Sequence, residues 1–180
     1  MDMLTQRAML LTGLAGMLIE CGGAPVGPDI VSLDTAGRIV QVDDTFPRLQ
    51  GTAADGSVVD SREWRGRVQV VFFWALYCKT CLGGAGDLLD LQHMQSSFGR
   101  ERMNAIAINP IDDRGEVREI QTACQYTYPF IADEGRALWR RYGQLDLPSV
   151  YVVDGDGVVR YRAAGFDAFA VADVVRALQR

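Results

Sequence analysis

Two cysteines, Cys78 and Cys81, lie three positions apart at the end of an apolar run that begins at Val70. Such a CxxC pair can be a redox couple, half of a metal site, or two unreactive buried thiols. A thiol attacks only as its thiolate, and a free pKa of about 8.5 leaves most of it protonated at neutral pH. A helix N-terminus and the ammonium group of Lys79 would both favour the thiolate of Cys78. We therefore predict that Cys78 is the nucleophile and that Cys81 resolves the mixed disulfide formed on it.

A metal site would need more ligands than this pair supplies. The only histidine, His93, lies twelve residues after Cys81, and there is no second CxxC. Protein zinc sites use three or four protein ligands. We expect no metal and place His93 on the surface of a helix. Copper binding by the thiolates with a ligand from elsewhere, and a pair of inert thiols, stay open as alternatives.

The elements before and after the pair should place it at a strand-to-helix junction. Asp55 and Gly56 indicate a hairpin turn, and residues 61–67 indicate a short helical turn. The β-branched and aromatic run 68–74 is typical of a buried strand. After Cys81, apolar residues recur at helical spacing, which predicts a helix with the cysteines at its N-terminal end. These apolar residues are Leu88, Leu89, Leu91, Met94 and Phe98.

The rest of the chain alternates strands and helices. The expected elements are a strand at 103–109, a helix at 114–126, a strand at 128–132, a helical turn at 137–143, a hairpin at 149–165 and a helix at 167–179. This order predicts an α/β fold with a mixed central β-sheet flanked by helices.

Length and charge narrow the function classes. The chain has 180 residues and a formal net charge of -5, which fits one globular domain. Its basic residues are scattered, so we expect neither nucleic-acid binding nor a polybasic membrane surface. The glycines around the cysteine pair fit no phosphate-binding loop, so we expect no nucleotide and no cofactor beyond a redox-active disulfide.

The N-terminal region differs in kind from the rest of the chain. Residues 8–19 form an apolar block that is too short to span a bilayer but suits a signal-peptide core. We predict a leader at 1–24, a linker or added hairpin at 25–45, and one domain at 46–180. The end of the leader resembles a lipoprotein lipobox with Cys21 as the lipidated residue, although Glu20 stands where Gly or Ala is usual. We predict an exported, periplasmic or cell-envelope protein. Ordinary cleavage of the leader and an uncleaved anchor are the alternatives to lipidation, and a plain apolar helix with an incidental cysteine is the alternative to a leader.

Four motifs in order resemble the thioredoxin fold, and most closely the exported TlpA-like, Redoxin-related thiol-disulfide oxidoreductases. The segment FFWALYCKTC carries the hydrophobic strand, Trp74, Ala75 and the CxxC pair. Before it, SREWRGRVQV resembles the segment that leads into this strand. After it, YPFIAD and LPSVYVVDGDGVVRYRAAG resemble the later strands, with Pro148 at the start of the second. The resemblance covers about residue 46 to the C-terminus and implies a thioredoxin-like domain with an N-terminal extension.

The resemblance also implies a function and further site residues. It suggests reduction of disulfides in exported proteins, including the proteins of cytochrome c maturation, with a membrane electron donor as a further partner. The family's cis proline matches Pro148, beside Cys78, and the backbone of Leu147 would pair with a substrate segment. A trans proline that starts a strand is the alternative. Trp74 and Tyr77 are the other expected substrate contacts, with Lys79 and Thr80 tuning the cysteine pair.

The sequence departs from the family at three positions, two of which carry acids in the family. Phe72 replaces the buried Asp of thioredoxins, Gly84 replaces a Glu of TlpA-like reductases, and Gly86 replaces a proline. These acids help to move the proton of the buried cysteine, so Cys81 lacks its usual base. Asp87 is the substitute that the sequence offers. The residues between the cysteines do not fix the direction of electron flow.

Two other classes on this fold stay open. A peroxiredoxin-like peroxidase would need Thr and Pro where this chain has Ala75 and Val71, although Cys124 could act as a resolving thiol. We expect Cys124 instead to be a buried free cysteine on the core face of its helix. The other alternative is a module that binds a metal or a partner without turnover.

Overall fold

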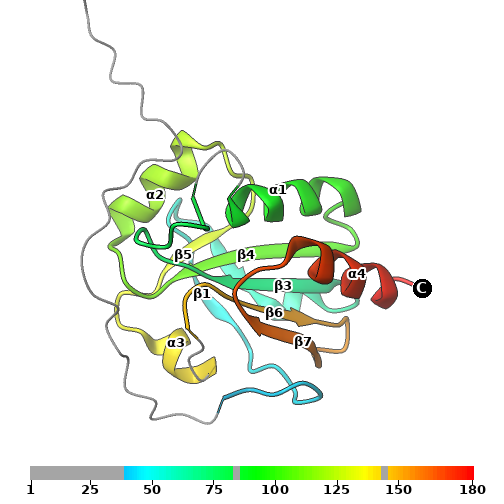
Figure 1. Cartoon of the computed structure of the whole chain (residues 1–180). Coiled ribbons are helices and arrows are strands. Elements are labelled where there is room, and N and C mark those ends of the chain that lie inside the picture. The colour runs from blue at the N-terminus through cyan, green and yellow to red at the C-terminus, as the bar shows by residue number, and fades with distance from the viewer. Residues whose placement is uncertain (1–38, 83–85, 143–145) are drawn as a thin grey trace, which may run out of the picture.

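The computed structural model describes residues 39–82, 86–142 and 146–180 (Figure 1). The expected leader, Cys21 and Gly84 lie outside these residues. The elements in chain order are β1 (Gln50–Thr52), β2 (Val58–Asp60), the 3-10 helix η1 (Ser61–Trp64), β3 (Val68–Phe73), α1 (Asp87–Phe98), β4 (Met103–Asn109), α2 (Arg114–Ala123), β5 (Phe130–Ala132), α3 (Ala137–Tyr142), β6 (Ser149–Val153), β7 (Val159–Ala164) and α4 (Ala168–Leu178).

A five-stranded sheet with the order β5-β4-β3-β6-β7 forms the centre of the fold. The strand β3 pairs in parallel with β4 and antiparallel with β6, so the sheet is mixed, as predicted. Every residue of β3 and β4 is buried, because helices and loops cover both faces of the sheet. The strand that leads to the cysteines is therefore the central strand.

Side chains of β3 alternate between two cores. Phe72 belongs to the core under α1 and α4, whose helices lie next to each other on one face of the sheet (Figure 1). Phe73 belongs to the second core, which α3 and the β1-β2 hairpin cover on the opposite face. The cysteine pair lies in the first core, directly beyond the end of β3.

Two expectations about local structure are wrong. The helix α1 begins at Asp87, six residues after Cys81, so the cysteines lie in turns before the helix and not in its first turn. Glycine has the highest conformational entropy cost in a helix, and a glycine, Gly86, caps the helix here. Cys124 is only partly buried and is disulfide-bonded, so it is not the free core thiol that its spacing suggested.

Candidate active site

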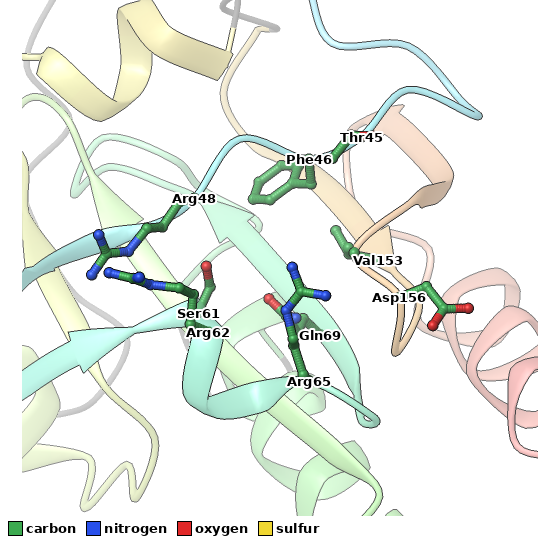
Figure 2. A pocket seen from close by; sticks show the side chains of 10 residues that line it. Thr45, Phe46, Arg48, Ser61, Arg62, Arg65, Gln69, Val153 and Asp156 are labelled. Atoms are coloured by element: carbon green, nitrogen blue, oxygen red, sulfur yellow. The ribbon is translucent and has the colours of Figure 1, made fainter.

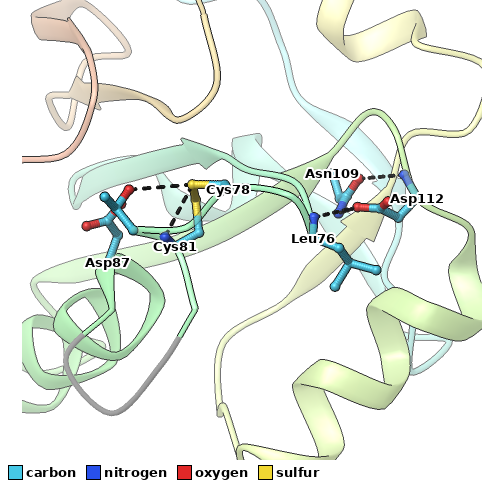
Figure 3. The surroundings of a disulfide bond; sticks show 7 residues. Leu76, Cys78, Cys81, Asp87, Asn109 and Asp112 are labelled. Carbon is cyan, nitrogen blue, oxygen red and sulfur yellow. Dashed lines mark hydrogen bonds between the residues drawn. A yellow bond between two sulfur atoms is a disulfide. The ribbon is translucent and has the colours of Figure 1, made fainter. Parts of the chain in front are cut away.

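A disulfide joins Cys78 and Cys81 at the end of the central strand, with the two sulfurs 2.05 Å apart (Figure 3). The turn starts with a hydrogen bond from the Cys78 amide to the carbonyl of Ala75, 3.0 Å long. Cys78 is 5 % exposed and Cys81 is 0 % exposed. Cys78 is thus slightly exposed at the surface, while Cys81 is fully enclosed by the protein.

One donor and one hydroxyl oxygen lie next to the sulfur of Cys78. The backbone amide of Cys81 donates a hydrogen bond to this sulfur over 3.2 Å. The hydroxyl oxygen of Thr80 lies 3.5 Å from the same sulfur and donates to Oδ2 of Asp87 over 2.9 Å. Hydrogen bonds to the charged form of a thiol favour that form. The amide of Cys81 would thus stabilise a thiolate on Cys78 after reduction.

Asp87 supplies the carboxylate of the site. One of its oxygens and the sulfurs of Cys78 and Cys81 all lie within 4.8 Å of one another. Partial burial is the main cause that raises the pKa of Asp87, the nearby charge of Asp90 raises it further, and the hydrogen bond from Thr80 opposes both. A carboxylate with a raised pKa next to a thiol is suited to accept its proton.

The position of the usual buried acid is apolar. Phe72 is fully buried and packs edge-on against the ring of Phe166, with centroids 5.1 Å apart. No carboxylate can approach the cysteines from this position of the strand. The first residue of α1 therefore supplies the acid that the strand lacks.

Gly86 permits the close approach of α1 to the cysteine turn. A Cβ at this position would lie 2.7 Å from the backbone carbon of Leu82 and 2.8 Å from the backbone oxygen of Cys81. The amide of Asp87 also donates to the carbonyl of Thr80 over 2.9 Å. Any residue with a side chain at position 86 would push the carboxylate of Asp87 away from the sulfurs.

A second acid, Asp112, holds the other side of the turn (Figure 3). Its Oδ2 accepts hydrogen bonds from the amide of Leu76 and from the side chain of Asn109, both 2.7 Å long. The side-chain oxygen of Asn109 in turn accepts from the amides of Ile111 and Asp112. These bonds tie the segment before Cys78 to the end of β4.

The comparisons with known proteins agree with this arrangement. The Redoxin family model matches residues 41–178 of the chain. The chain belongs to the Redoxin family. It is 21% identical over 155 residues to the thiol-disulfide oxidoreductase ResA of Bacillus thuringiensis subsp. konkukian, covering 86% of this chain and 87% of that protein. It is 25% identical over 160 residues to the thiol:disulfide interchange protein DsbE of Vibrio cholerae, covering 87% of this chain and 80% of that protein.

The fold of this Redoxin-family chain is also that of solved structures. A thiol:disulfide interchange protein of the thioredoxin family from Chlorobium tepidum TLS superposes with a TM-score of 0.65 at 18% identity, over 79% of this chain and 97% of that one. The predicted thioredoxin-like fold is thus confirmed. None of the helices in the described ranges is long and apolar enough to cross a membrane.

Other expected site residues of the Redoxin domain lie at different depths. Trp74 is fully buried and packs against Phe130, so its ring offers no surface to a substrate in this state. Tyr77 is half-buried, and its pKa is raised mainly by burial. The bond between Leu147 and Pro148 is cis, as expected, and both residues are partly exposed.

Charged and metal-binding candidates lie around the same turn. Lys79 is exposed next to the cysteines. Within the described residues, Cys78, Cys81 and Asp87 form the one group close enough to share an ion, and His93 lies apart on the exposed face of α1. The two sulfurs are joined in a disulfide, and in this oxidised state neither of them is a thiolate that could bind a metal ion. The sequence missed Asp112, because nothing in its neighbourhood marks a contact with a turn 36 residues away.

Proposed function

We propose that the protein is a thiol-disulfide oxidoreductase that reduces disulfides of exported proteins through Cys78 and Cys81. One observation carries this proposal: the two cysteines form a disulfide in which Cys78 keeps a slight exposure and Cys81 has none. A two-step exchange needs this division, because the first thiol meets the substrate and the second attacks only the mixed disulfide.

The first step is attack on the substrate by the reduced pair. The Cys78 thiolate attacks one sulfur of a substrate disulfide, the substrate S–S bond breaks, and the other substrate sulfur leaves as a thiolate that takes a proton from water. The amide of Cys81 is placed to stabilise the thiolate of Cys78, while the hydroxyl of Thr80 links the turn to Asp87.

The second step needs a base for the closed-off thiol. Asp87 takes the proton of Cys81, and the resulting thiolate attacks the sulfur of Cys78. The mixed disulfide breaks, the second substrate sulfur leaves as a thiolate, and the bond between Cys78 and Cys81 forms. Two electrons have then passed to the substrate, and a dithiol donor restores the pair by the reverse exchange. The proximity of the carboxylate to both sulfurs supports this role of Asp87.

The substrate segment would lie along the cis proline. The amide of Gly165 donates to the carbonyl of Pro148 over 2.7 Å, which commits that carbonyl to the loop after β7. The backbone of Leu147 is the neighbouring group that can pair with an extended peptide. Tyr77, half-buried beside the disulfide in sequence, is the aromatic contact we assign to the substrate in place of the buried Trp74.

The names of the relatives support the thiol-disulfide exchange itself. Proteins named ResA and DsbE are thiol-disulfide oxidoreductases or interchange proteins by their names. We extend to this chain an extracytoplasmic location, protein substrates that include those of cytochrome c maturation, and a membrane-bound electron donor. The peroxidase alternative has no observation in its favour, because Ala75 occupies the position of the peroxide-binding threonine and is fully buried.

A trapping experiment tests the function. Cys81→Ser should hold the natural substrate on Cys78 as a mixed disulfide that dithiothreitol releases, and mass spectrometry would identify the trapped protein. Cys78→Ser is the matched control and should trap nothing. The proposal fails if both variants recover the same proteins, or if the wild-type protein does not reduce a disulfide-bonded model protein in the presence of dithiothreitol faster than dithiothreitol alone.

A further inference from the structure

A cavity lies at the opposite end of β3 from the disulfide, between η1 and the turn that joins β6 to β7 (Figure 2). Its volume is about 220 Å³, which suits a small molecule. Gln69 lines this cavity near the start of β3, whereas the cysteines follow the other end of the strand. Four residues of strand at ~3.3 Å each separate Gln69 from Phe73 by roughly 13 Å. An occupant of the cavity would therefore leave the cysteine site free.

The side chain of Gln69 is an unusual feature of this cavity. Gln69 is only 4% exposed, yet its amide makes no hydrogen bond within the part of the chain that the structure describes. Gln69 is not among the residues whose buried side-chain atoms lack a partner, so solvent in the cavity reaches its amide. A mostly buried side chain whose amide lines the cavity is placed to donate a hydrogen bond to an occupant.

The charge around the cavity is positive. Arg48 and Arg62 both contact the single carboxylate of Asp60, and Arg48 holds the pKa of that carboxyl well below its usual range. Two guanidinium groups thus share one negative charge. Arg65 forms no ion pair with any described residue, and Figure 2 shows its guanidinium directed toward Val153 from the end of η1.

The remaining wall is apolar and firmly held. The ring of Phe46 lines the cavity and stacks on Tyr142, with centroids 4.5 Å apart and planes 4° apart. Val153 is fully buried beside it. Asp156, the acidic residue of the lining, turns its carboxylate away from the other side chains (Figure 2). The cavity therefore combines a cationic side with an aromatic one.

We propose that this cavity binds a small organic oxyanion, a carboxylate or phosphate group attached to an apolar body. The free guanidinium of Arg65 would hold the anion through paired hydrogen bonds, and the amide of Gln69 would donate a further one. The apolar body would lie against Phe46 and Val153. This site is separate from the cysteine pair and does not depend on its redox activity.

Aromatic probes that differ only in their head group test this site on the full chain. The probes are benzoate, phenyl phosphate, neutral benzamide and cationic benzamidine, with inorganic phosphate as an anion that has no apolar body. Nitrogen-15 NMR titration should show saturable shifts of the Gln69 side-chain amide with benzoate or phenyl phosphate, and the stronger of the two identifies the head group. Benzamide and benzamidine should give dissociation constants at least tenfold higher.

Variants separate the proposed contacts from general surface charge. Arg65→Gln and Gln69→Leu should each raise the dissociation constant of the anionic probe by about tenfold or more, since a hydrogen bond to a charged group is lost. Arg118→Gln removes the same charge from an exposed position on α2 and should leave binding unchanged. Thermal unfolding of each variant checks that the fold is intact, and Arg65→Gln, an exposed substitution, keeps the test valid if Gln69→Leu unfolds.

Three results would overturn the proposal. They are the absence of saturable shifts with every anionic probe, equal binding of benzamidine and benzoate, and equal affinity in the wild-type protein and Arg65→Gln. Tight binding of inorganic phosphate without any gain from the phenyl group would show an adventitious ion only. Disulfide reduction by Cys78 should persist in all these variants, so a failure here is distinguishable from a failure of the proposed function.

Discussion

Replacing Asp87 by Asn should lower both the apparent pKa of the thiol pair and the rate of exchange. The carboxylate oxygen lies within 4.8 Å of both sulfurs. Two like charges at this separation repel by about 3 kcal/mol at an effective dielectric constant of ~20. Because Asp87 is partly exposed, solvent screening reduces this repulsion, and we expect the apparent pKa of the reduced pair to fall by about one unit in the variant.

The exchange rate should nevertheless fall. Without a carboxylate to accept the proton of Cys81, release of the mixed disulfide should slow by about 10²-fold, the lower end of general-base contributions. The thiolate pKa is measured by alkylation rate against pH, and the release step by stopped-flow fluorescence. Asp173→Asn, on the exposed face of α4, removes the same charge and should change neither. An unchanged release rate in Asp87→Asn, or a rise in the thiol pKa, would refute the assigned role.

The same substitution should not weaken the fold. The folded protein raises the pKa of Asp87 above its ordinary value of 3.8. The folded state therefore holds this proton more tightly than the unfolded state, and stability is lost as pH rises from 3.8 through the folded pKa. The Asp87→Asn variant has no carboxyl group to ionise and therefore does not lose stability in this way. In urea unfolding at pH 7 it should be at least as stable as the wild type. A variant that is clearly less stable at pH 7 would show that the ionised carboxylate is a structural contact.

Three further substitutions test the contacts of the turn. Thr80→Val removes the hydroxyl next to the sulfur of Cys78 and should slow release of the mixed disulfide about tenfold in stopped-flow assays. Gly86→Ala places a Cβ 2.7 Å from the backbone of Leu82 and should lower the free energy of unfolding in urea by about 1–3 kcal/mol. Asp112→Ala leaves the amide of Leu76 without its acceptor, should cost about 1–3 kcal/mol in urea unfolding, and should slow exchange.

Matched controls make these results decisive. Thr80→Ser keeps the hydroxyl and should restore the rate. Gly135→Ala adds the same methyl group where no atom lies within 4 Å and should be nearly neutral, so equal losses at both glycines would contradict the close-approach argument. Asp112→Asn keeps an oxygen acceptor for the amide of Leu76. If it destabilises as much as Asp112→Ala, the negative charge matters more than the hydrogen bond.

The sequence by itself predicted the order of elements and favoured redox chemistry for the cysteine pair. The apolar run before Cys78 predicted the central strand, because a strand covered on both faces has few polar positions. The Asp-Gly turns and the amphipathic C-terminal helix were likewise legible, since local patterns specify them. The structure confirms the expected pairing of Cys78 with Cys81, which a separation of three residues allows.

Only the tertiary structure decided which groups serve those cysteines. The sequence could name Asp87 as a substitute acid, but its distance from the sulfurs depends on the path of the chain through Gly86. The contact of Asp112 with the amide of Leu76 joins two strand ends of the sheet and has no local signal. Likewise, the open amide of Gln69 lies in a strand that reads as core, and its cavity exists only because η1 and the β6-β7 turn meet there. Long-range packing, which no short pattern encodes, therefore set the proton chemistry of the site.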